Sequence, residues 1–406
     1  MSMQATTRPP KGLRLLLTAW FVFLGWVDVV LVSRAGEYLG YSELGTVLAF
    51  STGALVIGIA VAPLVPLAVK PSLVLAGLLT VVSIVGIAAT LVGLPKAMIY
   101  VVVLSVWCLT SFASGIIDNA SGALAIRVST GGRADAVLLL GIRRTGALIA
   151  SVFTTYAVSQ HLSPAWHYTV VGVLLLIPVL MTAVMPDVAT QSTAAQSRTT
   201  GVGSTAKQFW ILVLMGAFLA AAVMPTLLSL AWASPLMKEL HASDSFATYG
   251  TLVFLASQVV ACFAYYARSG KRKMHELVPA GLWVSVVGVV LLAATVLQVH
   301  LQFMSPAAGQ WLALAGIAVF GWGIAPVPFA ILIYVGELQL RWNNRVRTAV
   351  AVVIQCGLMA FGNWAFGLAA EAFSAIDAYP VVALLCIVAL LIGMQPMFRK
   401  LRTGQA

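Results

Sequence analysis

Long apolar stretches recur along the whole chain, separated by short segments that carry charges, Pro and Gly. A helix needs about 20 apolar residues to cross the roughly 30 Å hydrocarbon core of a bilayer. Windows of this length predict membrane-spanning helices at 13–32, 44–67, 72–93, 98–126, 136–159, 168–185, 209–229, 247–267, 277–299, 311–335, 348–370 and 379–397. The pattern therefore predicts twelve spans, with one polar Ser/Thr/Gln-rich segment after the sixth.

This polar segment divides the chain into two sets of six spans. We expect an all-α membrane protein with two pseudo-symmetric six-helix bundles, at 1–186 and 207–406, joined by a cytoplasmic linker at 187–206. The sequence Phe-Ala-Ser-Gly-Ile beginning at Phe112 in span four is echoed by Phe-Gly-Trp-Gly-Ile beginning at Phe320 in span ten. A repeat of this kind is typical of alternating-access carriers, whose binding site lies near the midplane between the repeats.

Composition supports a membrane protein and excludes several other classes. The 406 residues are 61% hydrophobic and only 9% charged, against about 25% charged in soluble domains. The sequence has no HExxH, P-loop or GxSxG motif, so we expect neither an enzyme nor an ATP-driven pump, and no cofactor. The four cysteines are isolated and form no CxxC pair, which argues against a disulfide framework or a metal site.

The distribution of basic residues predicts the orientation. Of the 23 Lys and Arg residues, only Arg34, Lys96 and Lys238 fall on the side opposite the termini. By the positive-inside rule both termini are cytoplasmic, which gives a multi-pass protein of the plasma (inner) membrane. The net charge of +11 then suits an anionic inner leaflet and does not indicate nucleic-acid binding.

Charged residues inside the spans are the strongest functional signal. Asp118 lies nine residues from Arg127, about 13 Å into the membrane, and Arg143 lies eight residues from Asp135, about 12 Å deep. An acid and a base on consecutive antiparallel spans thus lie at one depth, where charges are costly and usually line a polar pathway. Arg143 and Arg144 point about 100° apart and should not both face one cavity, so we expect only one of them to pair with Asp118. The pair is either a structural lock or a proton or substrate switch.

Other polar residues inside the spans extend the candidate site. Asp28 is a second candidate for proton coupling, or else a partner of Arg34 at the membrane surface. The second half has no charge within its spans and offers amide and aromatic groups instead. The predicted solute-binding residues are Arg143, Arg144, Asn119, Trp26, Gln258, Trp322, Gln355 and Asn363.

A loop motif indicates the family. The segment Ala-Arg-Ser-Gly-Lys-Arg-Lys at 267–273 resembles the D-R-x-G-R-R-K loop of the major facilitator superfamily, with Ala267 in place of the acid. The equivalent loop of the first half keeps one basic residue, Lys70. Glu337 with Arg345 and Arg347 resembles the inner ends of that family's spans ten and eleven. The resemblance implies that Arg268, Gly270, Lys271, Arg272, Glu337 and Arg345 take part in conformational change.

Span five is similar to one branch of that superfamily. The segment Leu-Leu-Gly-Ile-Arg-Arg-Thr-Gly-Ala-Leu-Ile-Ala at 139–150 resembles the Gly-x-x-Arg-x-x-Gly segment of sugar- and nucleoside-type proton symporters, where an Arg in span five pairs with an acid in span four. This resemblance implies a monomeric secondary carrier that moves a small organic solute together with protons. The alternatives are a proton-driven exporter of drugs or natural products and a non-transporting receptor or scaffold.

Overall fold

The structure is a computed structural model that describes residues 11–30, 39–62, 68–90, 95–128, 133–185, 205–268, 274–328, 330–331, 335 and 344–395. Within these ranges every regular element is a helix. The helices are α1 Lys11–Val30, α2 Tyr41–Val61, α3 Val69–Thr90, α4 Lys96–Val128, α5 Arg133–Ser159, α6 Pro164–Val184, α7 Thr205–Glu239, α8 Asp244–Arg268, α9 Met274–Leu301, α10 Pro306–Ile324, α12 Asn344–Ala372 and α13 Ala375–Gly393.

All twelve helices are long and apolar enough to cross a membrane. The predicted number of spans is therefore confirmed. Helices suit lipid because every backbone N–H and C=O within the span bonds inside its own segment. The outer surface is also apolar: Trp210, Trp283 and Ile392 are exposed by 67%, 62% and 69% of their surface. These side chains would be unfavourable in water and fit the hydrocarbon core.

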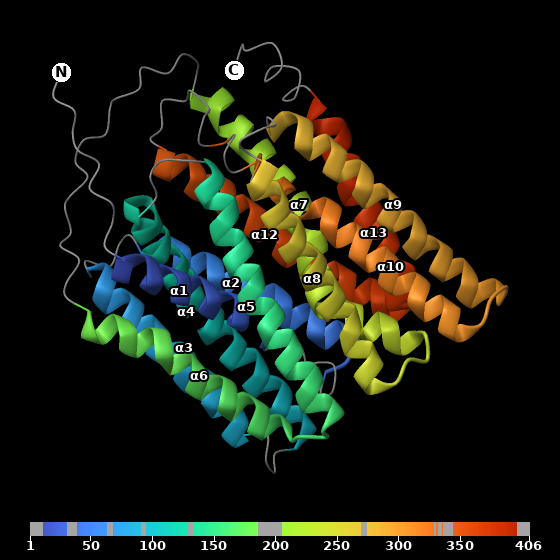
Figure 1. Ribbon diagram of the computed structural model, residues 1–406, viewed down its shortest axis with the longest axis horizontal. Helices are drawn as coiled ribbons and strands as arrows, with labels where there is room; N and C mark the ends of the chain where they lie inside the picture. The colour runs from blue at the N-terminus through green and yellow to red at the C-terminus, as the bar shows by residue number, and fades with distance from the viewer. Residues whose placement is uncertain are drawn as a thin grey trace.

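The helices form two bundles, as predicted. In Figure 1, α1–α6 occupy one side of the molecule in blue to green, and α7–α13 occupy the other in yellow-green to red. Contacts between the bundles run mainly along two helix pairs, α2 with α12 and α5 with α8. The linker predicted at 187–206 lies almost entirely outside the described residues, so its boundaries remain a prediction. We call one end of the molecule the distal end. It is the end at which α5 and α7 finish and α2 and α8 begin.

Two helices differ from the predicted spans. The seventh span was expected to end at Ser229, but α7 continues to Glu239 through Pro225 and Pro235. Proline removes one hydrogen bond without ending a helix when neighbouring helices hold it in place. The tenth span was expected to cover 311–335, but α10 begins at Pro306 and ends at Ile324, two residues before Pro326.

The crossing of α1 and α5 brings the charged residues of the site together. A Cβ atom at Gly25 would overlap the backbone carbonyl of Arg143, and one at Gly146 would overlap the backbone of Val22. Small residues at such crossings let two helix backbones approach closely. Asp28 lies three residues after Gly25, nearly one helical turn further on, so the close crossing carries its carboxylate to Arg143.

Candidate functional site

A cavity of about 400 Å³ lies between the two bundles. The first bundle contributes residues of α1, α2, α4 and α5, and the second contributes residues of α7, α8 and α12 together with Ala325 and Pro328. A cavity that both halves line is the position expected for the solute site of a carrier built from two repeats.

One face of α4 lines this cavity with polar groups. Trp107, Ser111, Ser114 and Asp118 all belong to the lining, and their spacing of four, three and four residues places them on a single helix face. Of these four residues, only Asp118 was predicted from the sequence. The spacing of Trp107, Ser111 and Ser114 relative to Asp118 is the signal that would have identified the others.

Arg143 on α5 binds two acids from two other helices. Its Nε and Nη2 donate to Oδ2 and Oδ1 of Asp28 at 2.8 and 2.9 Å. Its Nη1 donates to Oδ1 of Asp118 at 2.9 Å. Asp28 thus accepts a bidentate pair of hydrogen bonds, which is the strong geometry for an arginine and a carboxylate, while Asp118 accepts a single one.

The three charged side chains remain accessible from the cavity. The exposed fractions are 24% for Arg143, 25% for Asp28 and 28% for Asp118. Each charge has a partner, which offsets part of the cost of removing it from water. Because about a quarter of each side chain is open, a proton or a solute has access to the cluster.

Arg144 also lines the cavity. We expected that two adjacent arginines could not both face it, because their directions differ by about 100°. The structure contradicts this: the lining wraps around α5 from the α1 and α4 side to Gln258 on α8, and both long side chains reach it. Within the described part of the chain, Arg144 makes no hydrogen bond or ion pair.

The second bundle contributes the predicted amide groups. Gln258, Gln355 and Asn363 all line the cavity. Gln258 donates through Nε2 to Oγ1 of Thr226 at 3.2 Å. Its Oε1 and both side-chain polar atoms of Asn363 are buried without a partner among the described residues. Buried polar groups are normally hydrogen-bonded, so these atoms are candidates to bind a solute.

Three predicted solute-binding residues lie outside the cavity lining. Trp26 is buried and packs against Phe153, with ring centroids 6.2 Å apart. Asn119 is exposed, because the residue after Asp118 is turned about 100° away around the helix. Trp322 packs against a small apolar cluster that includes Tyr265 and Ala325. The geometry gives these three residues no direct contact with a solute in the cavity.

Most of the predicted conformational loop lies outside the described residues. Arg268 is the last residue of α8 and is exposed. Gly270, Lys271, Arg272 and Glu337 lie outside the described residues. Arg345 lies in the first turn of α12, where only the backbone is described. Their role in conformational change therefore stays a prediction.

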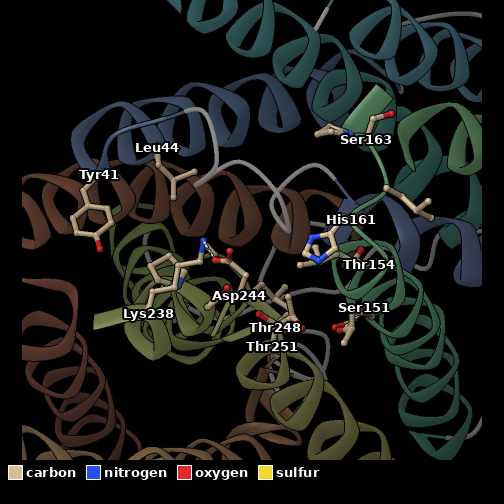
Figure 2. Close-up of a pocket in the computed structure, with 18 residues that line it drawn as sticks. Tyr41, Leu44, Ser151, Thr154, His161, Ser163, Lys238, Asp244, Thr248 and Thr251 are labelled. Carbon is tan, nitrogen blue, oxygen red and sulfur yellow. Dashed lines mark hydrogen bonds and ion pairs between the residues drawn. The ribbon is translucent and has the colours of Figure 1, made fainter. Parts of the chain in front are cut away.

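A second cavity, of about 480 Å³, lies at the distal end between α2, α5, α7 and α8. Figure 2 shows that Thr154 and Ser151 line it opposite Thr248 and Thr251, with Lys238 beside Asp244. The Lys238 Nζ and Asp244 Oδ1 atoms are 3.0 Å apart, and these side chains are 45% and 78% exposed. An ion pair this exposed contributes little energy, so the central cavity is the better candidate for the functional site.

Leu230 on α7 lines both cavities. Its side chain is only 4% exposed. This leucine is therefore part of the wall between the distal cavity and the central one.

Comparisons with known proteins identify the fold. No family model matches the sequence, and no curated protein does. Among solved structures, 93% of the chain aligns with 96% of a D-xylose–proton symporter at 15% identity and a TM-score of 0.72. A variant of the nucleoside transporter NupG aligns over 93% of this chain and 100% of its own, at 14% identity and a TM-score of 0.66. The proton:xylose symporter XylE bound to 6-bromo-6-deoxy-D-glucose aligns over 94% of both chains, at 15% identity and a TM-score of 0.66.

These similarities show that the chain is a multi-pass membrane protein with the fold of the major facilitator superfamily. The resemblance predicted from the loop and from span five is confirmed at the level of the fold.

Proposed function

We propose that this protein is a secondary active carrier that moves a small polar organic solute together with protons by alternating access. The observation that carries the proposal is the cluster of Asp28, Arg143 and Asp118 in a cavity lined by both bundles. Ionisable groups inside membrane spans are expensive and usually serve transport. The fold is also that of a D-xylose–proton symporter.

The hydrogen bonds assign different roles to the two acids. Protonating Asp28 would weaken two hydrogen bonds from Arg143, whereas protonating Asp118 would weaken only one. Asp118 is therefore the proposed proton-binding group, and Asp28 holds Arg143 in position. A solute that draws Arg143 away from Asp118 would favour protonation of the carboxylate, because an unpaired charge is disfavoured in a low-dielectric site.

In this proposal the protein works as a monomer in the plasma membrane, with both termini in the cytoplasm beside an anionic leaflet. Arg268 and the loop after α8 would take part in switching between conformations. The first alternative is a proton-driven exporter of drugs or natural products. The second alternative is a receptor or scaffold that does not transport. Neither alternative gains separate support from the cavity or from the solved structures.

Asp118→Asn tests the proposal in proteoliposomes of the purified protein. A thermal-shift screen of sugars, nucleosides, monocarboxylates and antibiotics first identifies a ligand, because a ligand stabilises the folded state it binds. We expect the variant to lose accumulation driven by a pH gradient and to keep exchange of that ligand across the membrane. Glu371→Gln is the control, since Glu371 is an exposed carboxylate at the end of α12.

Accumulation at the wild-type level in Asp118→Asn would remove Asp118 from coupling. Thermal shifts from lipophilic antibiotics alone would favour the exporter. Ligand binding without exchange in the wild-type protein would favour the receptor.

A further inference from the structure

Arg144 is a cavity-lining cation whose hydrogen-bond donors are unused within the described part of the chain. The adjacent Arg143 donates three hydrogen bonds to the two acids, whereas the guanidinium of Arg144 has no partner within the described part of the chain. A guanidinium carries five N–H donors in a planar fork that matches a carboxylate. We propose that Arg144 binds the solute and that the solute is a small organic monocarboxylate. This inference rests on the proposed function and names the class of its solute.

The charges of the cavity support a single negative charge on the solute. Its lining holds two acids and two arginines among the described residues, so its formal charge is zero when both acids are ionised. A proton on Asp118 raises the formal charge to +1, and a bound monocarboxylate returns it to zero. A neutral cavity is the least costly state to move through a low-dielectric membrane. One proton and one monoanion would therefore cross together without net charge movement.

The remaining lining indicates what the rest of the solute resembles. Leu219, Val223, Val352 and Met359 give the second bundle's side of the cavity an apolar surface. This surface suits a short apolar body attached to the carboxylate and disfavours a densely charged phosphate. Trp107 Nε1 and Asn363 Nδ2, both buried without a partner among the described residues, are further donors for polar substituents.

The decisive comparison uses matched pairs that differ only in charge. The melting temperature of the purified full-length protein is measured with benzoate against benzamide, with lactate against lactamide, and with D-xylose and uridine. We expect each carboxylate to bind about tenfold or more tightly than its amide, because a hydrogen bond to a charged group contributes enough free energy for an affinity difference of that size. Equal binding of acid and amide, or binding of the neutral solutes alone, would overturn the inference.

Variants of Arg144 connect this preference to the residue. We expect Arg144→Gln to abolish the difference between acid and amide, and Arg144→Lys to keep part of it. Arg14→Gln removes one positive charge from an exposed position near the start of α1 and should keep the full difference. A preference for the acid that persists in Arg144→Gln would overturn the assignment. If that variant does not fold, the matched pairs with the wild-type protein still decide the solute class.

Transport separates this inference from the proposed function. In proteoliposomes, uptake of the bound carboxylate should follow an imposed pH gradient and ignore an imposed membrane potential. Proton-driven uptake of D-xylose or uridine with no uptake of carboxylates would overturn the inference that the solute is a monocarboxylate. The same result would support proton-coupled transport. If neither class of solute accumulates, both proposals fail.

Discussion

The hydroxyl of Tyr41 donates a hydrogen bond of 2.9 Å to the carboxylate of Glu239, joining the first residue of α2 to the last residue of α7. Glu239 also accepts hydrogen bonds from the backbone N–H groups of Ala375 and Ile376 at the start of α13, at 3.0 and 2.8 Å. The Tyr41 ring packs edge-on against Trp232, with centroids 5.4 Å apart. This contact fastens the two bundles at the distal end, and it must break whenever that end opens.

We therefore expect Tyr41→Phe to favour opening of the distal end. A hydrogen bond to a charged group contributes about 1.5–3 kcal/mol, so the open population should rise roughly tenfold or more. Cys356 lines the central cavity and reports on opening. The measurement uses a background protein in which Cys108, Cys262 and Cys386 are replaced by Ala. In this background, Tyr41→Phe should increase the rate at which a membrane-impermeant thiol reagent, added from the distal side, labels Cys356.

Tyr249→Phe is the matched control for this measurement. Tyr249 lies on α8 and is 41% exposed, so its hydroxyl does not hold the bundles together. Labelling of Cys356 at the same rate in Tyr41→Phe and in the unmodified background would show that the Tyr41 hydrogen bond does not control opening.

The second prediction concerns the contact between α2 and α12. A Cβ atom at Gly45 would lie 2.8 Å from the carbonyl oxygen of Asn363 and 2.8 Å from the Cα of Gly367. We expect Gly45→Ala to push the helices apart, to destabilise the distally closed state by about 1–3 kcal/mol, and to lower the melting temperature. Thermal unfolding of the purified protein measures this effect.

Gly53→Ala on the same helix provides the comparison. No atom lies within 4 Å of a Cβ atom placed at Gly53. The substitution should be neutral or slightly stabilising, because alanine favours a helix by about 1 kcal/mol over glycine. Equal melting temperatures for the Gly45 and Gly53 variants would mean that α2 and α12 tolerate a wider separation.

The third prediction concerns the charge cluster. Arg143→Gln leaves two carboxylates close together without a cation, and we expect it to destabilise the protein strongly. The decrease in the free energy of unfolding should be smaller than the roughly 3–5 kcal/mol typical of breaking a fully buried ion pair, because these side chains are about a quarter exposed. Adding Asp28→Asn removes the carboxylate that lost two hydrogen bonds, and the double variant should recover part of the melting temperature.

Arg143→Lys distinguishes charge from geometry in this cluster. A lysine keeps the charge but lacks the planar fork that bridges two carboxylates. We expect its stability to fall between those of the wild type and of Arg143→Gln, with proton-driven accumulation lost. The double variant Arg143→Gln with Asp28→Asn provides the contrary outcome. A melting temperature of this double variant no higher than that of Arg143→Gln would indicate that Asp28 and Arg143 do not interact energetically.

The fourth prediction concerns the wall between the two cavities. Leu230→Ala should join them and let solute pass without a complete conformational cycle. We expect accumulation driven by a pH gradient to fall while solute exchange persists or accelerates. Leu214→Ala, a truncation of a leucine that is 50% exposed on the same helix, should leave both activities unchanged. Unimpaired accumulation in Leu230→Ala would show that Leu230 is not part of the barrier.

Several of these features were readable from the sequence because they depend on local geometry. Hydrophobic length fixes the number of spans, and the rise of about 1.5 Å per residue places Asp118 and Arg143 at one depth. The ion pair of 2.9 Å between them follows from that common depth together with consecutive antiparallel helices. The polar face of α4 was also present in the spacing of Trp107, Ser111 and Ser114.

Other features depend on how the helices are rotated and where they cross. The sequence left open whether Asp28 faces the cavity or pairs with Arg34, and the close α1–α5 crossing at Gly25 and Gly146 directs it to Arg143. It also assigned Asn119 to the site, although that residue is exposed.

The sequence by itself determined the membrane class, the number of helices and the depth of the charges, because these follow from hydrophobic length and helix pitch. The tertiary structure alone decided which acid holds Arg143 by two hydrogen bonds and that Arg144 reaches the same cavity without a described partner. Side-chain pairing depends on helix rotation and on the packing of distant segments, which no local pattern specifies.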